Sequence, residues 1–130
     1  MPDHDAIVQP VWGHGVTEPE LPEVVLALTL DQAIVQERAT GDQGADLLFS
    51  HSGVRVVVHC KRYVKSVGNK AVQEAHAARG FYNCDRALVV TSSTFTSSAR
   101  ALADALDVAL VAGSDIAKIG SFVGVLARAR

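Results

Sequence analysis

Cysteine is scarce in this sequence, which contains only Cys60 and Cys84 among its 130 residues. Two thiols are too few for a disulfide framework, and neither lies in a CxxC pair or in the spacing of zinc ligands. No HxxxH histidine pair is present either. A disulfide-stabilised scaffold and the common zinc sites are therefore excluded, and both cysteines are expected to be free thiols.

Long apolar runs and nucleotide-binding glycine motifs are also missing. No run of about eighteen apolar residues could span a bilayer. The segment from Met1 to Gln9 carries acids and a histidine where a secretory signal would place lysines before an apolar stretch. Because there is no Walker block and no GxGxxG motif after a strand, the sequence 41–44 is not a nucleotide-binding loop. We expect a cytoplasmic protein without a membrane partner.

An excess of basic residues is missing as well, because the formal net charge is −2. With 48% hydrophobic and 20% charged residues, the composition is that of one globular domain and not of a lysine-coated nucleic-acid binder. The acids dominate from Asp3 to Asp31, so that one face could still be basic. An ordinary solvated lysine face is the open alternative. The clustered basic residues are Lys61, Arg62, Lys65 and Lys70.

The order of predicted elements is αβββαβαβα. Residues 1–18 show no apolar period, and we interpret them as an N-terminal arm of uncertain order before a domain over residues 19–130. Continuous apolar runs near the end of the chain are typical of strands covered on both faces and joined by helical crossovers. The predicted helices are Glu23–Asp31, Asn69–Gly80, Ser97–Leu106 and Ser114–Ala127, and the predicted strands are Ala33–Arg38, Ala45–Phe49, Val54–Lys61, Ala87–Thr91 and Val108–Val111.

The two neighbouring strands Ala45–Phe49 and Val54–Lys61 predict a β-hairpin. The segment Ser50-His51-Ser52-Gly53 between them has the residues of a four-residue turn. Such a turn would place Phe49 opposite Val54.

This register would bring three functional side chains together. Counting back along the hairpin places Asp46 opposite Val57, on the face that His59 and Lys61 share through strand alternation. A slip of one residue would send Asp46 to the other face. The alternative is that Asp46 only starts a strand and that Lys61 extends from a strand end into solvent.

An aspartate, a histidine and a lysine on one face suit the hydrolysis of a phosphodiester. That reaction needs a divalent cation, which lowers the pKa of a bound water, and a lysine can orient or deprotonate the water. The carboxylate of Asp46 suits Mg²⁺ or Mn²⁺, and the main-chain carbonyl of Cys60 could add an oxygen ligand.

Five blocks of sequence occur in order between about Pro22 and Ile119, and they are Thr40–Leu48, Val57–Tyr63, Val67–Glu74, Leu88–Thr91 and Phe95–Ala99. Together they resemble the catalytic domain of the Mrr-type restriction endonucleases, a family of the PD-(D/E)xK nuclease superfamily. The resemblance implies a restriction-endonuclease-like fold, in which three α/β/α layers enclose a central mixed β-sheet. It also implies a metal-dependent endonuclease that acts on DNA.

The resemblance assigns roles to single residues. Asp46, the second aspartate of the GDxGxD block, matches the metal-binding acid, and Lys61 matches the lysine of the (E/Q)xK block. Gln73 matches a polar helix position that tends to face the site, but an ordinary surface glutamine explains it equally well. Asp42 could assist the site, although an aspartate among glycines is more often a turn residue.

The chief departure from the family is His59, which stands where the family has glutamine or glutamate. A neutral imidazole binds manganese, zinc or nickel more readily than magnesium. We expect His59 to remain a metal ligand beside Asp46 and Cys60, with Mg²⁺ as the cofactor or with Mn²⁺ preferred.

The expected function is hydrolysis of DNA by a restriction-type endonuclease. The candidate phosphate contacts are Arg62, Lys65, Lys70, Thr91 and Ser92, which are basic or hydroxyl residues. The expected partners are DNA, a second copy of the chain in a homodimer, and a separate recognition domain or subunit. The alternative is a DNA-binding or assembly module that has kept the fold and lost catalysis through the change at His59.

Overall fold

The computed structural model describes residues 21, 25, 35–38, 45–51, 53–61, 65–119 and 121. The elements in chain order are β1 (Val35–Arg38), β2 (Leu47–His51), β3 (Val54–Lys61), α3 (Asn69–Phe81), β4 (Arg86–Thr91), α4 (Ser97–Leu106), β5 (Val108–Val111) and the 3-10 helix η3 (Gly113–Lys118). The predicted arm, residues 1–18, lies outside the described residues. In the part of the chain that is described, no helix has the length and apolar character needed to cross a membrane.

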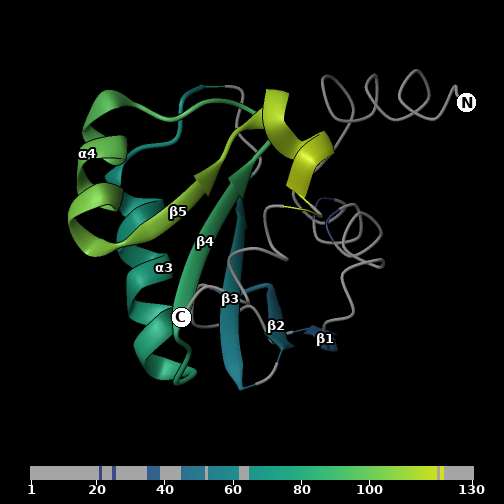
Figure 1. Ribbon diagram of the computed structural model, residues 1–130. Coiled ribbons are helices and arrows are strands. Elements are labelled where there is room, and N and C mark those ends of the chain that lie inside the picture. The colour runs from purple at the N-terminus through teal and green to yellow at the C-terminus, as the bar shows by residue number, and fades with distance from the viewer. Residues whose placement is uncertain are drawn as a thin grey trace, which may run out of the picture.

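The five strands form one mixed sheet in the order β1-β2-β3-β4-β5. Strands β1, β2 and β3 are antiparallel neighbours, whereas β3, β4 and β5 run parallel. Helices α3 and α4 form the crossovers between the parallel strands and lie together on one side of the sheet (Figure 1). The carboxyl ends of β3, β4 and β5 therefore meet at the same end of the sheet.

Two hydrophobic cores, one on each face of the sheet, confirm the three-layer arrangement. Side chains alternate along β3, so that Val57 faces α3 and α4 while Val56 and Val58 face the opposite layer. The core under α3 and α4 includes Leu48, Val67, Val72, Ala75, Val89 and Ala99. The core on the other face includes Leu21 and Val25, which are helical, together with Phe49, Leu88, Ile116 and Ile119.

The turn of the β2–β3 hairpin is two residues shorter than predicted. The observed register pairs Phe49 with Val56 and His51 with Val54, so that only two positions separate the strands. Gly53, at the second position of the turn, has a φ of 86°, which a glycine adopts without strain and which a type I′ hairpin turn requires there. The sequence 50–51 therefore extends β2 instead of forming the turn.

The two long helices begin in different ways. Thr96 caps α4 through its hydroxyl oxygen, which accepts the N–H of Ala99 at 3.0 Å. Helix α3 begins at Asn69, as predicted, and Gly68 takes the extended cap position without a side-chain bond. The predicted helix Ser114–Ala127 begins as the 3-10 turn η3, and most of its second half lies outside the described residues.

The segments that follow β3 and β4 are bound to each other. Val67 and Phe95 form a parallel bridge, in which the Val67 N–H donates to the Thr94 carbonyl at 2.8 Å and its carbonyl accepts the Thr96 N–H at 3.0 Å. The hydroxyls of Ser66 and Thr94 lie 2.8 Å apart. These bonds fix the first turns of α3 and α4 relative to each other.

Candidate active site

The candidate site lies at the end of the sheet where β2 begins and β3 ends. Asp46 immediately precedes β2, and His59 is the third residue from the end of β3. Since Leu47 pairs with Val58, the next pair outward is Asp46 and His59. The register is displaced by two residues from the prediction, and an even displacement leaves every side chain on its predicted face.

Asp46 is fixed to β3 by its backbone and by its side chain. Its N–H donates to the Val58 carbonyl at 2.8 Å, and its Oδ2 accepts the N–H of Cys60 at 2.7 Å. The side chain is still 31% exposed. The carboxylate is thus held in one orientation at the strand end while part of it faces solvent.

His59 lies between two carboxylates. The residue is only 8% exposed, and its Nε2 atom is 3.1 Å from Oε1 of Glu74 on α3, which is a hydrogen bond. Its Nδ1 atom is 3.6 Å from Oδ2 of Asp46, which is too far for one. Nδ1 is buried and has no hydrogen-bond partner in the described structure.

The residue that sequence reasoning missed is Glu74. Gln73, the predicted helix residue, is exposed, whereas its neighbour Glu74 is half-buried and contacts His59. The signal was in the helical period: Ala71, Ala75 and Ala78 mark the buried side of α3, and position 74 lies beside them on the same side. Position 73 lies outside that stripe.

Lys61 lies beyond His59 at the end of β3. It is half-buried, and its Cα atom pairs with that of Thr91 in the parallel neighbour β4. Strand alternation places its side chain on the His59 face. Asp46, His59 and Lys61 thus belong to one face at one end of the sheet.

The predicted DNA-contacting residues differ in their exposure. Lys65 and Lys70 are exposed and Ser92 is half-buried. Thr91 is fully buried, and its Oγ1 accepts the N–H of Ser93 at 3.1 Å, so that its side chain has no surface with which to touch a phosphate. Arg62 lies outside the described residues, as does Asp42.

The donor set of the site fits a divalent cation. A buried ring nitrogen without a partner lies beside a carboxylate oxygen, and the other ring nitrogen binds a second carboxylate, which is the arrangement that histidine ligands of metals commonly have. Among the described residues, no group of three or more His, Cys, Asp or Glu side chains could hold an ion by itself. The side chains of Asp46 and His59 would therefore need further oxygen ligands, such as the main-chain carbonyl of Cys60 or water.

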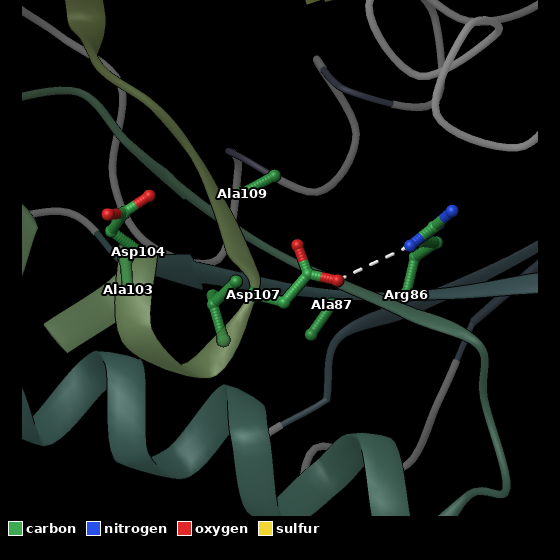
Figure 2. A pocket seen from close by; sticks show the side chains of 7 residues that line it. Arg86, Ala87, Ala103, Asp104, Asp107 and Ala109 are labelled. Atoms are coloured by element: carbon green, nitrogen blue, oxygen red, sulfur yellow. Dashed lines mark hydrogen bonds and ion pairs between the residues drawn. The ribbon is translucent and has the colours of Figure 1, made fainter. Parts of the chain in front are cut away.

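A small pocket at the opposite end of β4 and β5 has a different character. Figure 2 shows Arg86 and Asp107 directed toward each other across it, and their nearest side-chain atoms are 3.4 Å apart. Asp107 has a left-handed backbone and ends α4. These contacts explain the pocket as part of the link between α4 and the sheet, and the histidine and carboxylate cluster lies at the other end of the strands.

A comparison with family models matches residues 14–119 to Mrr_cat, described as a restriction endonuclease. No curated protein matches the chain. The family match includes Asp46, His59, Lys61 and Glu74.

Solved structures share the fold at low sequence identity. A protein of unknown function, AF1548, has a TM-score of 0.64 and 18% identity over 83% of this chain and 65% of its own. VC1899 from Vibrio cholerae has a TM-score of 0.63 and 13% identity over 84% of this chain and 32% of its own. EndoMS in a complex with double-stranded DNA has a TM-score of 0.56 and 22% identity over 74% of this chain and 44% of its own. The present chain thus spans less than two thirds of the length of these proteins.

Proposed function

The chain belongs to the Mrr-type restriction endonuclease domain family, and from this membership we propose that it is a divalent-metal-dependent endonuclease that hydrolyses phosphodiester bonds in DNA. The observation that carries the proposal is the pair formed by the Asp46 carboxylate and the unpartnered Nδ1 of His59, on the strand end that also carries Lys61. This pair offers one oxygen and one nitrogen ligand at a single point.

Each residue of the site has a proposed role. Asp46 and His59 would hold the cation, Mg²⁺ or Mn²⁺, and the carbonyl of Cys60 would add an oxygen ligand. When bound, the cation neutralises charge on the phosphate and makes a bound water more acidic. Lys61 would orient the water for attack in line with the 3′ oxygen. As the water oxygen bonds to phosphorus it would lose a proton to solvent, the bond from phosphorus to the 3′ oxygen would break, and that oxygen would take up a proton, which leaves a 5′ phosphate and a 3′ hydroxyl.

The nucleic-acid contacts that we propose lie around this strand end. Lys65 is exposed between β3 and α3, Lys70 is exposed in the first turn of α3, and Ser92 follows β4. Arg62, next to Lys61 in the sequence, completes the set. Such contacts bind the phosphate backbone without reading bases, so binding should weaken steeply as salt rises.

The relatives favour DNA as the substrate and a larger assembly as the working form. One structural neighbour is EndoMS in a complex with double-stranded DNA, and another is the MspJI restriction endonuclease with a 27-mer oligonucleotide, of which this chain covers 35%. We propose that a second copy of the chain supplies the cut of the opposite strand and that a separate domain or subunit selects the target.

A plasmid assay tests the proposal. Purified wild-type protein and Lys61→Ala are incubated with supercoiled plasmid in Mg²⁺, Mn²⁺ or EDTA, and DNA binding is measured in parallel by gel retardation. The proposal is supported if the wild type nicks or linearises the plasmid, if EDTA and Lys61→Ala each abolish this cleavage, and if the variant still binds DNA. Cleavage by Lys61→Ala at the wild-type rate would refute the role of the lysine.

One observation favours a second candidate, a binding module without catalysis. His59 takes the position of the family's glutamine or glutamate, and it is already hydrogen-bonded to Glu74. If that pair only stabilises the fold, the wild type will retard plasmid without cutting it in either metal.

A further inference from the structure

We infer that Glu74 is a positioning residue: its carboxylate holds His59 in the tautomer that carries a proton on Nε2, which leaves the lone pair of Nδ1 facing the cation site beside Asp46. The inference rests on the proposed function, because it takes that site to bind a divalent ion. Glu74 itself touches neither the ion nor the substrate. It acts through the imidazole alone.

The hydrogen-bond chemistry of the ring determines the tautomer. A neutral imidazole has one donor and one acceptor nitrogen, and an ionised carboxylate only accepts. At 3.1 Å from Oε1 of Glu74, the Nε2 atom of His59 is therefore the donor. Nδ1 is then the acceptor, and no donor of the described structure reaches it.

Asp46 cannot replace Glu74 in this role. Its Oδ2 atom accepts the backbone N–H of Cys60 at 2.7 Å, and it lies 3.6 Å from Nδ1. Among the described carboxylates, only that of Glu74 is within hydrogen-bond distance of the imidazole. The tautomer thus depends on one side chain of α3.

The arrangement leaves two acceptors facing each other on the Asp46 side of the ring. Both the lone pair of Nδ1 and the carboxylate oxygen of Asp46 attract positive charge, and the buried nitrogen loses its hydration without gaining a partner. A cation bound between them removes this cost. The orphaned nitrogen is therefore the side of the ring that a metal occupies.

The tautomer also favours one class of cation. A nitrogen lone pair suits Mn²⁺ and later transition ions better than Mg²⁺, and a carboxylate on the other ring nitrogen makes that lone pair more basic. Glu74 should thus raise the affinity for Mn²⁺ by about 10- to 100-fold, which is the usual effect of such a partner, and should change Mg²⁺ affinity far less.

The first test reads the tautomer in metal-free protein. Two-bond ¹H–¹⁵N correlation spectra of ¹⁵N-histidine-labelled protein separate a protonated ring nitrogen from one with a free lone pair, and His59→Gln identifies the His59 signals. Wild type and Glu74→Gln should show a proton on Nε2, because the glutamine oxygen can still accept it. Glu74→Ala should shift both nitrogens toward the averaged values of exchanging tautomers.

The second test measures binding of Mn²⁺ and of Mg²⁺ by titration calorimetry with no DNA present. Glu74→Ala should lose Mn²⁺ affinity selectively, Glu74→Gln should recover most of it, and Asp104→Ala, which removes an exposed carboxylate from α4, should match the wild type. Glu74→Gln keeps an acceptor for Nε2 and should leave thermal unfolding close to that of the wild type, whereas Glu74→Ala leaves the Nε2 of a buried imidazole without an acceptor and should lower the unfolding temperature.

The outcomes separate the inference from the proposed function. An unchanged His59 tautomer in Glu74→Ala, both ring nitrogens protonated in the wild type, or equal losses of Mn²⁺ and Mg²⁺ affinity would each overturn the inference, even in an active nuclease. A wild type that binds Mn²⁺ in a Glu74-dependent way but cuts no plasmid would uphold the inference and reject the nuclease.

Discussion

Asp46 accepts the backbone N–H of Cys60 through its Oδ2 atom at 2.7 Å, where β2 meets the end of β3. The same oxygen lies 3.6 Å from the unpartnered ring nitrogen of His59. One atom therefore continues the strand pairing and also faces the proposed cation. The two roles need different properties of the side chain, since the hydrogen bond needs an acceptor and the cation needs a negative charge.

Two substitutions at this position should separate those roles. Asp46→Asn keeps an oxygen acceptor for the Cys60 N–H, so its free energy of unfolding should stay within about 0.5 kcal/mol of the wild type, while plasmid cleavage should be lost. Asp46→Ala should also lose cleavage, and because the Cys60 N–H then has no acceptor, its free energy of unfolding should fall by about 1 kcal/mol. Urea denaturation and the plasmid assay measure both quantities. Wild-type cleavage by Asp46→Asn would contradict the proposed ligand role.

Replacing His59 with the glutamine of the family should change the preferred metal. In His59→Gln an amide oxygen replaces the imidazole nitrogen, so the ratio of the cleavage rate in Mg²⁺ to that in Mn²⁺ should rise by about tenfold or more. His76→Gln, on the exposed side of α3, is the matched control and should leave the ratio unchanged. An unaltered ratio in His59→Gln would show that the imidazole does not bind the ion.

The salt dependence of binding should identify the phosphate contacts. In EDTA, which prevents cutting, Lys65→Gln and Lys70→Gln should each lower the slope of log K against log salt by about one and weaken binding equally for different DNA sequences. Arg86→Gln, at the opposite end of β4, should keep the wild-type slope. Fluorescence anisotropy over a range of salt concentrations gives these slopes. An unchanged slope in both lysine variants would show that neither lysine contacts a phosphate.

Two glycines should respond to alanine in opposite directions. A Cβ atom at Gly113 would clash with the carbonyl oxygen of Ser92, so Gly113→Ala should cost about 1–3 kcal/mol as the backbone moves apart. A Cβ at Gly80, within α3, meets no atom within 4 Å, and Gly80→Ala should stabilise the protein by up to about 1 kcal/mol. Thermal unfolding of both variants checks the signs, and a neutral Gly113→Ala would refute the close approach.

The sequence was sufficient to predict the layers of the fold because the apolar periods are strong. The runs that became β3 and β4 are almost wholly buried in their centres, β5 is buried at its two ends, and α4 has the predicted bounds, Ser97–Leu106. The hairpin turn was harder, since serine and histidine at 50–51 suit a turn as well as a strand. Ser50 pairs with both β1 and β3, and His51 pairs with β3, so both residues belong to the strand. These long-range contacts cannot be recognised from the local sequence.

Only the site residues that lie on strands could be predicted from the sequence. Strand alternation alone places His59 and Lys61 on one face, whatever the length of the turn. Choosing between Gln73 and Glu74 required the rotation of α3 about its axis, which the buried alanines set through packing. The burial of Thr91 could not be predicted either. A buried hydroxyl needs a hydrogen-bond partner, and here the partner is the N–H of Ser93, which the sequence pattern does not reveal.

The bridge between Val67 and Phe95 has a mechanical consequence for the imidazole. It ties together the two connections that lead into α3 and α4, so α3 cannot slide along its axis unless α4 moves with it. The carboxylate proposed to orient His59 is therefore anchored through both crossovers of the sheet, and a substitution that loosens the bridge should also change how firmly the imidazole is held.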